Sequence, residues 1–286
     1  MSLRITERCR VVVDNDWAGD PDGLVALAHH LLTRANRVVA VTSSHLSPVF
    51  GPPAGGAAAG AAFAQQLVDL VDGTHRPVVA AGCDVPIDGG DTRSAAADVI
   101  VAEARRDDPL PLFLVCAGPL TNVAQALRHA PEIAQRLTLV WVGGALDADA
   151  FEYNRETDAQ AAREVLACRD LAISQFPLET YRRCSYSVAE LEHDLGGSGR
   201  VGAWLWERYL ELPIPDFVAQ GETWPLGDSP PVLVTALDDA TSAWTESEAG
   251  PGGAARRVYT DVDVRLLVAD LLARLRLHER RTARAG

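Results

Sequence analysis

The stretch VVVDNDWAGDPDGLVALAHHLL, from Val11 to Leu32, places a group of aspartates between two apolar patterns. The first apolar run has the length and β-branched content of a buried strand. The second has apolar residues at helical spacing from about Gly23 onward. The stretch therefore predicts a strand, an acidic loop and a helix in direct succession.

The same alternation of strand and helix patterns continues along the chain. Strands are predicted at about residues 10–16, 36–44, 76–82, 111–118, 137–145 and 171–176, with helical patterns between them. Near-continuous apolar strands that alternate with helices are typical of a mostly parallel sheet covered on both faces. We therefore expect an α/β fold: one domain, residues 1–286, with a doubly wound parallel sheet flanked by helices. Residues 246–257, rich in glycine and alanine, are expected to form a surface loop.

The composition excludes several classes of protein. The 286 residues include 39 acidic and 26 basic side chains, giving a net charge of -13, and every basic one is arginine. The negative charge argues against nucleic acid or an anionic membrane as the main partner. The absence of lysine excludes a P-loop, a Schiff-base enzyme and a protein kinase. With five scattered cysteines and no signal-peptide or membrane-length apolar run, we expect a cytoplasmic protein with reduced thiols.

Four aspartates, Asp14, Asp16, Asp20 and Asp22, lie within nine residues. Clustered carboxylates need water, a cation or protons to offset their repulsion. In doubly wound sheets ligands bind beyond the carboxyl ends of the strands, which is where this group falls. A helix cap at Asp22 or simple solvation is the alternative for any one of them. Four together favour a metal or catalytic site.

A D-x-D motif after an apolar strand also occurs in phosphatases of the haloacid-dehalogenase type, where the first aspartate is the nucleophile. This interpretation would make Asp14 the nucleophile of a Mg²⁺-dependent enzyme. Those phosphatases usually carry a downstream lysine, which this chain lacks, and Trp17 and Ala18 fit the motif poorly. It is the weaker alternative.

The aspartate stretch resembles the first motif of the inosine–uridine-preferring nucleoside hydrolases, D-x-D-P-G-x-D-D. Asp14, Asp16 and Asp20 match it in register, whereas Pro21 is inserted before Asp22. Segments similar to other family motifs follow in the same order, at residues 78–87, 116–127, 139–145, 151–166 and 225–237. The resemblance spans residues 11–237. It implies hydrolysis of the N-glycosidic bond of a ribonucleoside or related riboside, which gives base and ribose.

The resemblance also implies a Ca²⁺ site. Its ligands would be the carboxylates of Asp16, Asp22 and Asp228 and the backbone carbonyl of Ala117, since Ca²⁺ prefers oxygen ligands. The cation would hold two ribose hydroxyls and a water. Asp20 would be the general base that activates this water and would also contact the substrate, with Asp16 as the second candidate. Without the resemblance, Asp228 would be interpreted as a helix cap.

Further residues are expected to bind the substrate. Glu152 and Asn154 resemble the ribose-binding pair of the family, with a solvated loop as the alternative. Trp224 is a candidate for stacking on the nucleobase, or else a packed indole. Many family members place a histidine, the acid for the departing base, where this chain has Gly227. His45 is the candidate replacement, and a surface histidine is the alternative.

The expected partner is a small nucleoside or riboside, in purine or pyrimidine salvage. The resemblance suggests a homodimer or homotetramer. A different class of function also fits: a non-catalytic sugar or nucleoside binder that has kept the calcium site and lost the leaving-group acid.

Overall fold

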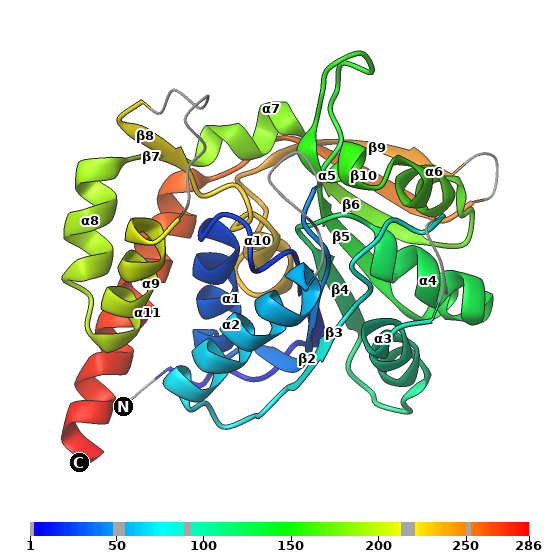
Figure 1. The fold of residues 1–286 in the computed structure, drawn as a ribbon. Helices are drawn as coiled ribbons and strands as arrows, with labels where there is room; N and C mark the ends of the chain where they lie inside the picture. Colours follow the sequence, from blue (N-terminus) through cyan, green and yellow to red (C-terminus); the bar gives the residue numbers. More distant parts are fainter. Residues whose placement is uncertain (1–2, 48–54, 89–92, 213–220, 250–252, 286) are drawn as a thin grey trace.

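The computed structural model describes residues 3–47, 55–88, 93–212, 221–249 and 253–285, and its centre is an eight-stranded sheet (Figure 1). The strand order is β3-β2-β1-β4-β5-β6-β10-β9, and all neighbouring pairs are parallel except β10–β9. The strands are β1 (Cys9–Asn15), β2 (Asn36–Ser43), β3 (Val78–Ala81), β4 (Leu112–Cys116), β5 (Thr138–Val142), β6 (Ala172–Phe176), β9 (Ala243–Glu248) and β10 (Ala255–Asp261). The predicted mostly parallel α/β fold is confirmed.

Helices cover both faces of this sheet (Figure 1). One face packs against α1 (Asp22–Leu32), α2 (Gly56–Val71), α9 (Arg200–Leu210), α10 (Pro231–Thr235) and α11 (Val264–Ala285). The other packs against α3 (Ala95–Arg105), α4 (Thr121–His129), the 3₁₀ segment η2 (Pro131–Arg136) and α6 (Ala159–Ala167). The smaller elements are α5 (Tyr153–Thr157), α7 (Leu178–Tyr181), η3 (Arg182–Cys184), α8 (Val188–Gly196) and a two-stranded sheet of β7 (Ser185–Ser187) and β8 (Thr223–Pro225). No helix in the described ranges is long and apolar enough to span a membrane.

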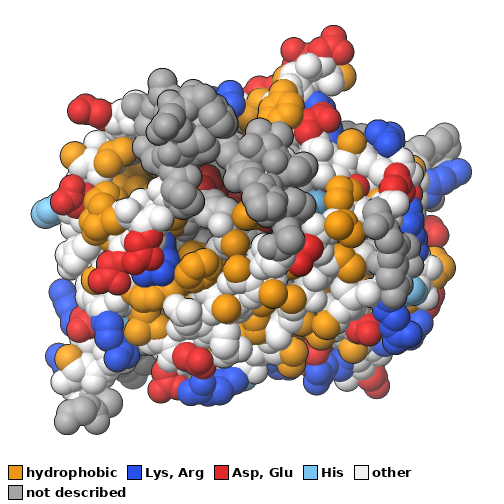
Figure 2. Space-filling model, in the orientation of Figure 1, with side chains coloured by type: hydrophobic (Ala, Val, Ile, Leu, Met, Phe, Trp, Pro, Cys, Tyr) orange, Lys and Arg blue, Asp and Glu red, His pale blue; other side chains and the backbone are white. Residues whose placement is uncertain are grey.

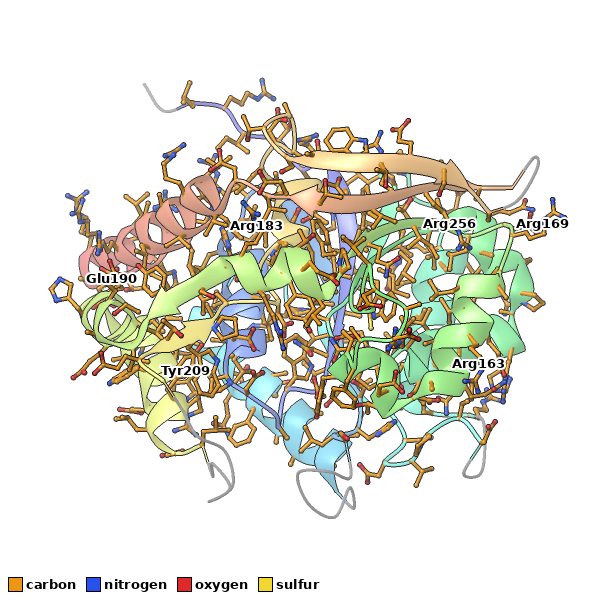
Figure 3. The ribbon with its side chains drawn as sticks, turned by 90° about the horizontal axis from the view of Figure 1, so that it is seen from above. Arg163, Arg169, Arg183, Glu190, Tyr209 and Arg256 are labelled. Atoms are coloured by element: carbon orange, nitrogen blue, oxygen red, sulfur yellow. The ribbon has the colours of Figure 1, made fainter. Side chains whose placement is uncertain are left out.

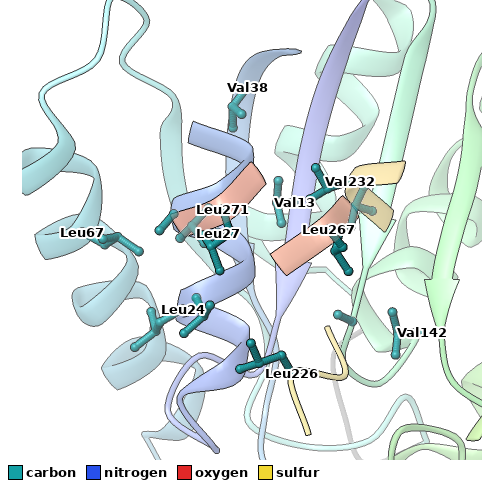
Figure 4. Close-up of a cluster of buried hydrophobic side chains, with 14 of the residues drawn as sticks. Val13, Leu24, Leu27, Val38, Leu67, Val142, Leu226, Val232, Leu267 and Leu271 are labelled. Atoms are coloured by element: carbon teal, nitrogen blue, oxygen red, sulfur yellow. The ribbon is translucent and has the colours of Figure 1, made fainter. Parts of the chain in front are cut away.

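The valines of β1 explain why this strand is central. Val11 and Val13 belong to the hydrophobic cluster on the α1 side, while Val12 belongs to the cluster on the opposite face. Side chains alternate across a strand, so an uninterrupted apolar run buries both faces at once. Figure 4 shows Val13 beside Leu27 of α1 and Leu271 of α11. Burying each such side chain stabilises the fold by about 1.5–3 kcal/mol.

The position of β1 also decides where a ligand can bind. It pairs with β2 on one side and β4 on the other, so the chain turns in opposite directions from the ends of β1 and β4. In doubly wound sheets this switch of direction leaves a crevice at the carboxyl ends of the strands. The aspartate loop after β1 therefore begins at the crevice.

The expectation of a surface loop at residues 246–257 is wrong at both ends of that range, and residues 250–252 lie outside the described residues. Residues 246–248 belong to β9 and residues 255–257 to β10, and these strands form an antiparallel hairpin in which Trp244 pairs with Tyr259. Tyr259 is buried and stacks on Phe176 of β6, with ring centroids 4.3 Å apart. Polar and charged residues alternate with these few aromatic ones, so the strands lack the continuous apolar run by which the buried strands were predicted.

The charged side chains are mixed on the face drawn in Figure 2. Arginines and carboxylates intersperse around its rim, while hydrophobic side chains gather across its middle. The described part of this face has no extended patch of a single sign.

Candidate active site

Three carboxylates from two distant parts of the chain meet at the carboxyl end of the sheet. Ligand oxygens of Asp20, Asp22 and Asp228 all lie within 4.8 Å of one another. Asp20 is exposed in the loop after β1, Asp22 is the first residue of α1, and Asp228 precedes α10. The backbone N–H of Asp228 donates to Oδ2 of Asp22 (3.2 Å), and Nδ2 of Asn15 donates to Oδ2 of Asp228 (2.8 Å). We call Asp20, Asp22 and Asp228 the carboxylate triad.

Neither Asp22, which is buried, nor Asp228, which is half-buried, acts as a helix cap. The residues that cap α1 and α10 are prolines without a side-chain cap hydrogen bond, so the capping alternative for Asp22 and Asp228 is wrong. Gly23 permits the close approach of α1. A Cβ on Gly23 would lie 2.5 Å from Nδ2 of Asn15 and 3.3 Å from Oδ2 of Asp228. A larger residue at this position would therefore displace Asn15 from Asp228.

The electrostatics of the triad fit a divalent cation. Burial raises the pKa of Asp22 and of Asp228 well above its usual range, and repulsion from Asp20 raises each further. Oδ1 of Asp22 is buried and accepts no hydrogen bond from the described residues. A buried carboxylate without a partner is costly unless a cation or a proton compensates it. An all-oxygen donor set of this kind suits Ca²⁺.

Asp16 lies beside the triad and is not one of its members. Burial raises its pKa well above the usual range, and the charges of Asp228 and Asp20 add to this effect. The hydroxyl of Tyr153 hydrogen-bonds to the Asp16 carboxylate and counteracts the shift in part. The structure thus places Asp20, expected as the general base, within the triad and Asp16, expected as a ligand, next to it.

The carbonyl of Ala117, which directly follows β4, is held by Asn154. Nδ2 of Asn154 donates to the oxygens of Ala117 (3.1 Å) and Val142 (2.9 Å), and so joins the ends of β4 and β5. A carbonyl oxygen has two lone pairs, so one lone pair of Ala117 remains for another ligand. Asn154 therefore positions the carbonyl that was expected to bind the metal.

Glu152 is fully buried, so the alternative of a solvated loop is wrong. Its Oε2 accepts from the backbone N–H groups of Gly144 (2.6 Å) and Arg155 (2.9 Å). Its Oε1 accepts from the N–H of Asn154 (3.1 Å) and the hydroxyl of Tyr181 (3.0 Å). Burial raises the pKa of Glu152, and its charge also acts on Asp228.

His45 is buried with both ring nitrogens engaged, so the surface alternative is wrong. Nε2 lies 3.1 Å from Oγ1 of Thr121, and Nδ1 lies 3.2 Å from the carbonyl of Leu46. Burial lowers the pKa of His45. In this conformation neither nitrogen is free to donate to a leaving group.

Trp224, in β8, stands edge-on to Tyr209 of α9, with ring centroids 5.6 Å apart and an interplanar angle of 85° (Tyr209 is labelled in Figure 3). Both Nε1 of Trp224 and the hydroxyl of Tyr209 are buried without a partner among the described residues. Burial raises the pKa of Tyr209, and the charges of the triad raise it further, which places this ring close to the triad. The two rings thus offer unused hydrogen-bond donors near the carboxylates.

Asp14 is separate from this site. It is completely buried and accepts from Thr42 (2.5 Å), Asn122 (2.7 Å) and Cys116 (3.5 Å). Burial raises its pKa to about 6. A carboxylate without an exposed oxygen cannot attack a phosphate, which argues against the phosphatase interpretation.

Four residues of the site were missed in the sequence: Asn15, Tyr153, Tyr181 and Tyr209. Asn15 is the last residue of β1 and lies between two conspicuous aspartates, which drew the attention away from its amide. Tyr153 lies between Glu152 and Asn154 in the sequence, whereas the other tyrosines lie outside any acidic motif. Only the fold brings them to the carboxylates. No periodicity or spacing signals them.

The fold and the triad define a doubly wound α/β protein with an acidic, cation-type site at its switch point. The model of the inosine-uridine preferring nucleoside hydrolase family matches residues 11–266, and the chain belongs to this family.

Individual relatives are distant. The chain is 27% identical over 146 residues to a pyrimidine-specific ribonucleoside hydrolase, RihA, of Salmonella arizonae, covering 49% of this chain and 46% of the relative. It is 32% identical over 120 residues to an uncharacterized protein of Schizosaccharomyces pombe, covering 38% of each. The chain thus spans less than half the length of these curated relatives.

Solved structures share the fold over almost the whole chain. An inosine-guanosine nucleoside hydrolase superposes with a TM-score of 0.71 at 19% identity, covering 95% of this chain and 98% of that one. The type III effector protein XopQ, solved in complex with adenosine diphosphate ribose, gives a TM-score of 0.65 at 18% identity, covering 97% and 93%.

Proposed function

We propose that the protein hydrolyses the N-glycosidic bond of a ribonucleoside or related riboside and depends on Ca²⁺. The observation that carries this proposal is the carboxylate triad, with its unpartnered Asp22 oxygen, at the switch point of a chain that belongs to this family. The partner is a small nucleoside or riboside.

The residues divide into two groups by role. Asp22, Asp228 and the carbonyl of Ala117 hold the cation, and the family resemblance adds Asp16 as a further ligand. When bound, the cation supplies positive charge that orients the two vicinal hydroxyls of ribose and polarises a water. Asp20, the exposed member of the triad, takes a proton from the water that attacks the anomeric carbon. Asp16 is the second candidate for this role.

As the water oxygen bonds to the anomeric carbon, the base leaves with the electron pair of the C–N bond. Positive charge that develops on the sugar ring is stabilised by the surrounding carboxylates. Trp224 forms an aromatic wall on which the nucleobase stacks. Gly227 cannot protonate the base, so good leaving groups are favoured.

The test is release of reducing sugar from uridine, inosine and p-nitrophenyl riboside, with calcium and with EDTA. Calcium-dependent release that is lost in Asp22→Asn and kept in Asp69→Asn, a surface carboxylate, supports the proposal. If sugar is released only from the nitrophenyl riboside, the protein lacks a group that protonates the leaving base, because nitrophenolate leaves without a proton. Calcium-dependent binding of a riboside without any turnover supports the non-catalytic binder instead. Release of phosphate from a phosphoester supports the phosphatase alternative.

We also propose a role in nucleoside salvage and a homodimer or homotetramer, both from the family resemblance, and a cytoplasmic location, from the five scattered cysteines expected as reduced thiols. Light scattering coupled to gel filtration tests the assembly, and a monomer would contradict it.

A further inference from the structure

Tyr181, the last residue of α7, closes the site on the Glu152 side. Its hydroxyl donates to Oε1 of Glu152 (3.0 Å). Its ring fills the space beside Gly227, because a Cβ on Gly227 would lie 3.1 Å from Cδ2 of Tyr181 and 3.5 Å from Oδ2 of Asp22. Tyr181 therefore lies between the buried glutamate and the triad. Burial and the charge of Glu152 raise the pKa of Tyr181, so the hydroxyl remains a donor at neutral pH.

Glu152 has no acceptor position to spare. A carboxylate offers about four lone-pair positions. Three of those on Glu152 are taken by the backbone N–H groups of Gly144, Asn154 and Arg155, and the fourth by Tyr181. The N–H groups of Asn154 and Arg155 belong to the first turn of α5 and cannot leave without unwinding it. Of the four donors, Tyr181 is the one that a side-chain rotation can remove.

The chemistry of ribose indicates which hydroxyl of the substrate would bind to the acceptor position of Glu152 that Tyr181 occupies. A ribonucleoside carries three sugar hydroxyls, and in the proposed function the vicinal 2′ and 3′ pair faces the cation. The 5′-hydroxyl is the one left for Glu152, whose charge acts directly on Asp228.

We infer that the hydroxyl of Tyr181 occupies the position on Glu152 that would otherwise receive the 5′-hydroxyl of the substrate. Tyr181 is then a specificity-determining residue, and the substrate class includes ribosides that lack the 5′-hydroxyl. The inference rests on the proposed function, since it requires ribose in this site.

The experiment compares kcat/KM for inosine with 5′-deoxyinosine, and for uridine with 5′-deoxyuridine, in the wild-type protein and in Tyr181→Phe with calcium. Phenylalanine keeps the ring beside Gly227 and frees one acceptor position on Glu152. We expect the wild type to discriminate less than about tenfold between the members of a pair. In Tyr181→Phe the preference for the 5′-hydroxyl rises about tenfold or more, the size of one hydrogen bond to a charged acceptor.

Tyr186→Phe is the matched control, because Tyr186 also donates to a carboxylate, Oδ2 of Asp194 (2.5 Å), and takes no part in the site. It should leave the preference unchanged. An equal preference in wild type and Tyr181→Phe overturns the inference. If Tyr181→Phe does not fold, the wild type alone decides, since rejection of the 5′-deoxyribosides by about a hundredfold also overturns it.

The two proposals fail in different ways. Hydrolysis of inosine or uridine with an unchanged preference removes the role of Tyr181 and leaves the proposed function intact. Absence of both hydrolysis and calcium-dependent binding for every riboside removes the proposed function, and the inference with it.

Discussion

The backbone N–H of Asp228 donates to the carboxylate of Asp22 (3.2 Å) although 206 residues separate the two in sequence. This bond joins the beginning of α1 to the loop before α10, and Asn15 supports it by donating to Asp228 from the end of β1 (2.8 Å). The acidic site thus depends on the complete fold, because its carboxylates come from the first strand–helix junction and from the last third of the chain.

Calcium should stabilise the folded protein, because three carboxylates that repel one another gain a common counterion. At a calcium concentration a hundredfold above Kd, the midpoint of thermal unfolding should rise by about 5 °C. Asp228→Asn should remove most of this rise, while Asp69→Asn should keep it. Differential scanning calorimetry with calcium and with EDTA measures both. An equal rise in all three proteins would place the calcium elsewhere.

Thr42→Val should destabilise the protein without changing calcium affinity. The valine matches threonine in shape and removes the donor that lies 2.5 Å from the buried Asp14 carboxylate. Loss of one partner of a buried charged group costs about 1–3 kcal/mol in the free energy of unfolding. Thr241→Val is the control, since this exposed threonine also donates to a carboxylate, that of Asp263. Urea denaturation should show the loss for Thr42→Val alone.

Gly23→Ala should weaken calcium binding. The new Cβ would lie 2.5 Å from Nδ2 of Asn15, so Asn15 must move away from Asp228. Gly56→Ala is the matched change at the start of α2, where the nearest atom would lie 3.6 Å away, and it should be neutral or slightly stabilising. Calcium titration calorimetry compares the two variants. Equal affinities would show that Asn15 does not position Asp228.

Stability should fall in mild acid because His30 is buried in its neutral form. Nδ1 of His30 accepts from Asn36 (3.1 Å), and burial lowers the pKa of His30 to about 3, whereas an unfolded histidine has a pKa of about 6.5. Below pH about 6.5 the unfolded state binds the extra proton. The contribution of His30 to the free energy of unfolding is therefore complete above that pH. It is lost as the pH falls towards 3, by about 1.4 kcal/mol per pH unit.

His30→Gln should reduce the slope of the free energy of unfolding against pH. His193→Gln, at an exposed position, should leave this slope unchanged. Urea denaturation of the three proteins from pH 7 to pH 5 measures it. Identical slopes in all three would show that His30 is not the group responsible.

The central sheet could be predicted because its inner strands are buried on both faces. β1 has a continuous apolar run, and the same signal marks β2, β4, β5 and β6. The hairpin of β9 and β10 lacks it, since Arg256 and Arg257 interrupt the pattern and the strands are held by a few aromatic contacts. One of those contacts, the stacking of Tyr259, is made with Phe176, far away in sequence.

The candidate site was predictable only where residue chemistry is conspicuous in the sequence. Asp16, Asp20 and Asp22 were singled out by their crowding, and Asp228 by the family resemblance. Tyr181 carries no such signal, because its relation to Glu152 and Gly227 exists only in the folded chain.

The most direct test of the central claim is the rate of ribose release from inosine and uridine by the wild-type protein and by Asp228→Asn, with calcium and after its removal by EDTA. The account predicts release by the wild type that stops with EDTA, returns with added calcium and falls at least about a hundredfold in the variant. Release that continues in EDTA, or that is equal in Asp228→Asn, would contradict the role of the carboxylate triad.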